Sequence, residues 1–142
     1  MLLKRLLAAY LVVTAFAVFF NLILTPVYHD GSPDYPVWEI LNWFMAAAVI
    51  LSLIVNFRRR FAIGDWRYSD LENLLISATY FASIALAMLF FWEWFWILNP
   101  DSETGDAVTS HIVYFPLVDT IFVIVALSTG RYLWNTADTG NQ

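Results

Sequence analysis

Three carboxylic acids lie in or beside apolar stretches of the sequence, where an ionisable side chain is costly. They are Glu39, Glu93 and Asp119. At 1.5 Å per residue, Glu93 lies about 9 Å and Asp119 about 10 Å or more from the end of its apolar segment, while Glu39 is close to the end. We therefore expect all three at one level, with Asn21 and Asn42 beside them. Such groups usually face the interior of a helix bundle, a watery cavity or a partner.

The sequence has no Lys or Arg on the side of the membrane where we expect these three acids, so their burial is not explained by an ion pair within the chain. The carboxyl groups are protonated, they bind a metal ion, or they meet a cation or backbone donor of another subunit. A metal site would consist of Glu39, Glu93, Asp119 and His111, because carboxylate and imidazole suit iron, manganese, zinc or copper. The Glu-x-x-His pattern of di-iron bundles is absent. Haem or chlorophyll ligation by His29 or His111 is a further alternative.

Several other kinds of chemistry are excluded by composition. The chain has no cysteine, which rules out disulfides, thiolate catalysis, iron-sulfur clusters and thiolate zinc sites within it. We find no phosphate-binding glycine loop, nucleophile elbow or His-Glu-x-x-His helix. The net charge of -5 argues against a nucleic-acid partner.

The elements that carry these residues are four apolar runs. The chain is 61% apolar and only 13% charged, which is far from the balance of a soluble domain. Each run is close to the roughly 20 residues that cross a bilayer, and lipid allows only helices or closed barrels. The sequence predicts an all-α fold in which residues 1–142 form a single transmembrane domain. Its helices should span about Leu6–Val27, Val37–Phe57, Asp70–Leu98 and Ile112–Trp134.

Local signals refine these boundaries. The segment Ser69–Glu72 has the form of a capping box, which predicts a helix start near Asp70. Pro116 either occupies the first turn of the last helix or kinks it, and the apolar residues before it favour a kink. The first run is longer than the apolar region of a signal peptide, so we expect it to be retained as a helix.

The charges predict an orientation. With four crossings, all seven Lys and Arg residues fall on one side, which the positive-inside rule makes cytoplasmic. These residues are Lys4, Arg5, Arg58, Arg59, Arg60, Arg67 and Arg131. The sequence therefore predicts an antiparallel four-helix bundle in the cell (inner) membrane, with both termini cytoplasmic.

Two features of the third run favour contact with another molecule. The segment Phe90–Trp96 is dense in aromatic residues, typical of a headgroup belt or of a contact surface for a partner helix, lipid, quinone or pigment. The cofactor-contact residues would be Trp92, Trp94 and Trp96. Ala78 and Ala82 have the four-residue spacing that allows close helix approach, within the bundle or with a partner.

These observations predict a small polytopic membrane subunit that packs against partner subunits, lipids or a hydrophobic cofactor in a larger complex. Its partner-binding residues would be Glu93, Asp119, Ala78 and Ala82, and the role would be accessory rather than catalytic. The alternative is a small metal- or proton-dependent membrane enzyme or transporter that uses the carboxylate and histidine cluster. The four-helix plan resembles small membrane subunits of respiratory, photosynthetic, monooxygenase and transporter complexes in architecture only.

Overall fold

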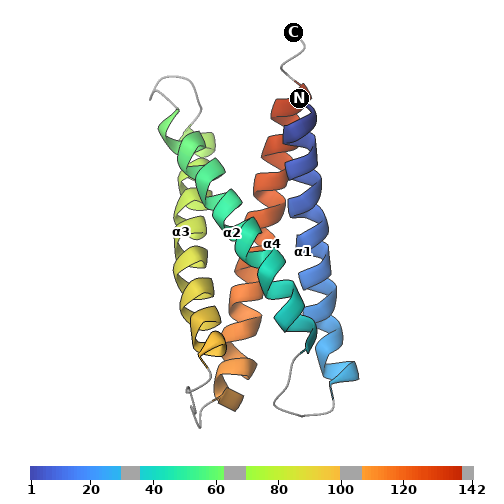
Figure 1. The fold of residues 1–142 in the computed structure, drawn as a ribbon. Coiled ribbons are helices and arrows are strands. Elements are labelled where there is room, and N and C mark those ends of the chain that lie inside the picture. The colour runs from blue at the N-terminus through green and yellow to red at the C-terminus, as the bar shows by residue number, and fades with distance from the viewer. Residues whose placement is uncertain (30–35, 63–69, 100–106, 139–142) are drawn as a thin grey trace.

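The structure, a computed structural model, consists of four long helices in the part of the chain that it describes (Figure 1). The description covers residues 1–29, 36–62, 70–99 and 107–138, without the side chains of 107–112 and 138. The helices are α1 (Leu2–Tyr28), α2 (Pro36–Phe61), α3 (Asp70–Leu98) and α4 (Ala107–Asp138). Each is long and apolar enough to cross a membrane, which confirms the predicted all-helical fold with four helices able to span a bilayer.

Three of the helices extend beyond the apolar runs of the sequence. α2 continues through the three arginines after Phe57, and α4 begins at Ala107 rather than at Ile112. Hydropathy marks the part of a helix that suits lipid, whereas backbone hydrogen bonding continues into the polar boundary. Pro116 lies in the interior of α4, not in its first turn.

The helices form two closely packed pairs. α1 packs along α4 and α2 packs along α3, while α2 also crosses α4 and α1 (Figure 1). α3 contacts α4, but within the described residues it makes no contact with α1. α3 is consequently the helix that the bundle covers least.

Small residues bring α1 and α4 close together. Gly130 of α4 faces α1, and a Cβ atom at this position would lie 3.1 Å from Val12 Cγ2 and 3.3 Å from the Ala8 carbonyl oxygen. Ala8 and Ala15 are fully buried, as is Ala126 on α4. In lipid, where apolar burial gives no net driving force, such close backbone approach is a main source of helix association.

Polar side chains are buried and large apolar side chains are exposed, the reverse of the arrangement in a soluble protein. Buried polar groups occur on all four helices, whereas the exposed surface carries many Leu, Ile, Val and Phe residues. Asn56 of α2 donates from Nδ2 to Thr129 Oγ1 of α4 at 2.9 Å, and Thr129 donates to the Val125 carbonyl oxygen at 2.7 Å. Tyr10 of α1 donates to the Phe44 carbonyl oxygen of α2 at 2.6 Å. The Asn56–Thr129 and Tyr10–Phe44 bonds each join two helices, whereas the Thr129–Val125 bond lies within α4.

The basic residues of the described helices gather at one end of the molecule, and Arg67 lies outside the described residues. The beginning of α1, the end of α2 and the end of α4 all lie at this end (Figure 1). Lys4 Nζ donates to the Thr136 carbonyl oxygen at 3.5 Å, and the Arg59 guanidinium lies 4.4 Å from the centre of the Tyr132 ring. These contacts connect α1 and α2 to the last turns of α4.

A bulky residue at Gly130 should separate α1 from α4. We expect Gly130→Leu to lower the free energy of unfolding in detergent by about 1–3 kcal/mol, because the added atoms overlap Val12 and the Ala8 carbonyl. Thermal unfolding measures the change. Ala9→Leu, at an exposed position of α1, is the control; equal stability of the two variants would contradict the close contact.

The Asn56–Thr129 hydrogen bond gives a second prediction. Thr129→Val keeps the shape of the side chain but removes the acceptor, so we expect a loss of about 0.6–1.7 kcal/mol in the free energy of unfolding. Thr120→Val is the matched control, because Thr120 is exposed and donates to the Pro116 carbonyl oxygen of its own helix. A smaller loss for Thr129→Val than for Thr120→Val would show that the bond contributes nothing.

Candidate functional site

A small buried pocket lies where α2, α3 and α4 converge. Its polar lining consists of Asn42 from α2, Glu93 from α3 and Asp119 from α4. The pocket has a volume of about 10 Å³, which is room for about one water molecule. We call it the carboxylate pocket; its remaining lining is apolar and consists of Met45, Phe90, Trp94, Ile97, Phe115 and Val118.

The two carboxyl groups are withdrawn from solvent and incompletely hydrogen bonded. Only 1% of Asp119 and 9% of Glu93 is exposed. Glu93 Oε1 and Asp119 Oδ2 have no hydrogen-bond partner within the described residues. A buried polar atom left without a partner costs about 1–3 kcal/mol, and more when the group is charged. Among the described residues, the pocket lining contains no Lys, Arg or His, so a proton, a bound cation or a group from outside these residues has to offset the two carboxyl groups.

Of the residues predicted to form one layer, the structure brings Asn42, Glu93 and Asp119 together and places the others elsewhere. Glu39 is exposed on α2 and does not line the pocket. Asn21 is buried on α1, where its Oδ1 accepts from the Tyr28 hydroxyl at 2.7 Å.

The structure describes the side chains of three of the four predicted metal ligands, Glu39, Glu93 and Asp119. Glu39 lies outside the carboxylate pocket, and the side chain of His111, near the beginning of α4, lies outside the description. Among the described side chains, those of residues 1–29, 36–62, 70–99 and 113–137, no three His, Cys, Asp or Glu residues form a group that could hold a metal ion. His29, the alternative haem or chlorophyll ligand, is half-buried at the end of α1. Ligation by either histidine stays a prediction.

The aromatic run of α3 divides between two faces of the helix. Trp94 is 8% exposed and lines the carboxylate pocket, with the Trp43 ring edge-on at 4.8 Å, whereas Trp92 is 59% exposed. Trp92, Phe95, Trp96 and Asn99 line a separate groove of about 240 Å³. The division follows from the helical period of 3.6 residues, because residues two apart face opposite sides.

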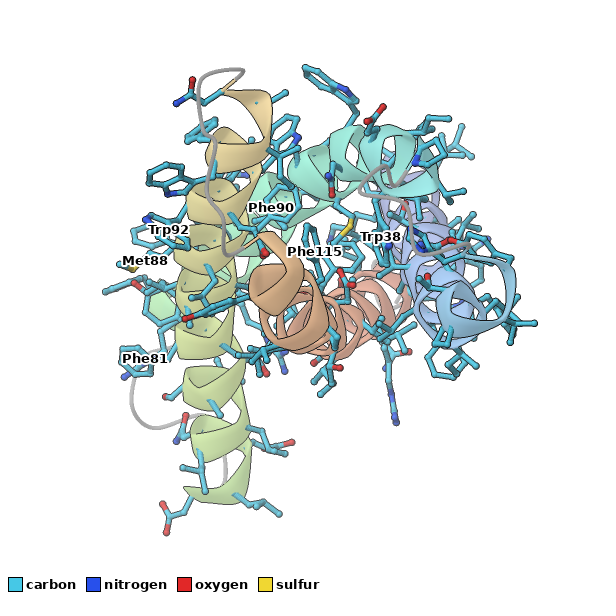
Figure 2. All side chains as sticks on the ribbon, turned by 90° about the horizontal axis from the view of Figure 1, so that it is seen from below. Trp38, Phe81, Met88, Phe90, Trp92 and Phe115 are labelled. Atoms are coloured by element: carbon cyan, nitrogen blue, oxygen red, sulfur yellow. The ribbon has the colours of Figure 1, made fainter. Side chains whose placement is uncertain are left out.

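An apolar face of α3 is exposed along its length and meets α4 at one end, where the Trp92 and Tyr114 ring centres are 6.5 Å apart. Figure 2 shows Phe81, Met88 and Trp92 on this side, with Phe90 on the side toward the bundle. Ala78 and Ala85 are exposed between these large side chains. We call the residues Ala78, Phe81, Ala85, Met88 and Trp92 the exposed α3 face. Ala82 is half-buried and packs against the core instead.

Ala85 and Met88 were not among the residues proposed from sequence. The signal that could have found this face is the alternation of small and large residues at steps of three and four along the helix. That spacing is hard to recognise in a helix that is apolar on every side.

Comparisons of the chain with protein-family models, with curated proteins and with solved structures found no match. Function must therefore be argued from the two features described above: the carboxylate pocket and the exposed α3 face.

The unpartnered carboxyl group predicts an unusual response to mutation. Glu93→Met replaces it with an apolar side chain of similar length, so the free energy of unfolding should rise by about 1–3 kcal/mol in buffer without metal cations. Phe90→Ala, which empties a neighbouring part of the pocket lining, should lower it by about 3–5 kcal/mol. Chemical unfolding in mild detergent measures both. A clear loss of stability in Glu93→Met would mean that the carboxyl group has a stabilising partner.

Proposed function

We propose that the protein is a small accessory subunit of a larger membrane complex, which binds a partner helix through the exposed α3 face. The observation that carries the proposal is the alternation of Ala78 and Ala85 with Phe81, Met88 and Trp92 on a face where all five residues are exposed within the described part of the chain. Small residues allow close helix approach, and large residues fill the spaces between the side chains of a neighbour.

The proposed orientation places both termini in the cytoplasm and the four helices in an antiparallel bundle across the cell membrane. The gathering of Lys4, Arg5 and the arginines at the end of α2 at one end of the molecule supports this orientation. In this arrangement the groove lined by Trp92, Phe95 and Trp96 lies at the opposite boundary of the membrane. Its volume of about 240 Å³ suits part of a lipid or of a hydrophobic cofactor.

The proposal assigns different roles to the four predicted partner-binding residues. Ala78 lies on the proposed interface, and Ala82 packs toward the core. Glu93 and Asp119 face the carboxylate pocket within this chain. A partner would therefore recognise shape and apolar contact, and not these two acids.

Photo-crosslinking in intact membranes tests the proposed interface. A photoreactive amino acid at Met88 should give a discrete crosslinked species, because this residue is 70% exposed on the proposed interface. The same amino acid at Val13 of α1, which is 67% exposed, is the matched control and should give only lipid adducts. Equal crosslinking to protein from both positions would contradict the choice of α3.

Purification in mild detergent provides a second test of the same proposal. The wild-type chain should purify with a stoichiometric partner chain or as a defined oligomer. Ala85→Trp should reduce this association by at least about tenfold, because the ring fills the space for the neighbouring helix, whereas Ala9→Trp on α1 should not. A stable monomer with no bound chain or cofactor would overturn the proposal.

A further inference from the structure

The carboxylate pocket is independent of the exposed α3 face, because its polar residues point into the bundle. Asn42, Glu93 and Asp119 come from three different helices and meet around one small cavity. Asp119 Oδ2 and Glu93 Oε1 are buried there and have no hydrogen-bond partner within the described residues. Two helices thus contribute unpartnered carboxyl oxygen atoms to a pocket that the described side chains leave unfilled, and a third helix contributes Asn42.

The size of the pocket restricts what can occupy it. A cavity of about 10 Å³ admits one water molecule or one monatomic ion, but not a quinone, a pigment or an organic substrate. The chemistry of the lining restricts the occupant further. Two carboxyl groups and one amide offer hard oxygen ligands, with no positive side chain in the lining to repel a cation or to take its place.

We propose that the carboxylate pocket binds one hard metal cation, such as Na⁺ or Ca²⁺, in exchange for protons on the Glu93 and Asp119 carboxyl groups. A monovalent ion would replace one proton and a divalent ion two, so the charge of the pocket stays balanced. Glu93 and Asp119 are the titratable groups of the lining; α2 contributes the uncharged Asn42. Without either occupant, two negative charges would face each other in a site of low polarity.

The neighbouring packing indicates a binding site and not a continuous path. Along α2 and α4, Val49, Phe122 and Val125 separate the pocket residues from the hydrogen-bonded pair Asn56 and Thr129. These three apolar side chains are at most 1% exposed. On the opposite side the lining includes Ile97, which is exposed near the end of α3. The cation would therefore enter and leave past the end of α3 that is remote from the basic residues.

Trp94 provides a built-in reporter, since it lines the pocket. The purified full-length protein in nanodiscs is titrated with NaCl, KCl, CaCl₂ or MgCl₂ against choline chloride of equal ionic strength, while tryptophan fluorescence and proton release are measured. We expect a saturable change with at least one cation. Lowering the pH by one unit should weaken binding by about tenfold for each proton displaced. The part of the fluorescence change that Trp94 reports should be lost in Trp94→Phe.

Variants assign the binding to the pocket. Asp119→Asn and Glu93→Gln should each weaken cation binding by on the order of tenfold or more, because each removes a charged ligand. Glu39→Gln, which removes an exposed carboxyl group outside the pocket, should bind as wild type does. Thermal unfolding verifies that each variant is folded. If one of the two pocket variants is unfolded, cation binding is measured with the other pocket variant.

Two outcomes would overturn the proposal. One is the absence of any saturable fluorescence change and any proton release with all four cations. The other is equal weakening in Glu39→Gln and in the folded pocket variants, which would place the effect at the surface. Neither outcome bears on the crosslinking at Met88, so failure of this inference is distinguishable from failure of the proposed partner interface.

Discussion

The constraint on which the rest of this structure depends is that lipid provides no hydrogen-bond partner. Every polar group within the membrane must therefore find its partner inside the bundle or accept the cost of having none. Asn56 Nδ2 and Thr129 meet this requirement through a bond between α2 and α4, although Asn56 Oδ1 has no partner within the described residues. Glu93 and Asp119 differ from Asn56 because their unpartnered oxygen atoms belong to ionisable groups that line one pocket.

The sequence predicts much of this arrangement because hydropathy and charge respond directly to the membrane. Apolar length indicated four spanning helices, and the spacing of Glu93, Asp119 and Asn42 from the ends of their segments placed them at one level. The same reasoning placed Glu39 with them, although the structure leaves it exposed. The depth of a residue in the membrane follows from its position along the helix. The direction in which its side chain points depends on which faces of the helix are covered by neighbouring helices. Hydropathy carries little information about those neighbours when all faces of the helix are apolar.

The aromatic run of α3 shows the same limit. From sequence, Trp92, Trp94 and Trp96 form one dense group, yet the helix turns Trp94 toward α2 and leaves Trp92 uncovered. Neighbouring tryptophans of one short segment thus lie in two different environments, Trp94 in the carboxylate pocket and Trp92 on the exposed α3 face. The beginning of α4 at Ala107 was also beyond prediction, because a helix can continue past its apolar part wherever its backbone bonds are satisfied.

The pairing of α1 with α4 has a consequence for biosynthesis. A ribosome delivers the first helix well before the last, yet these two share the most extensive contact in the bundle. Until α4 is inserted, the face of α1 that carries Ala8, Leu11 and Val12 lacks Gly130 and its neighbours, which pack against it. Closure of the fold therefore waits for the insertion of α4, and a product truncated before α4 would expose this face of α1 to quality-control proteases and to other membrane helices.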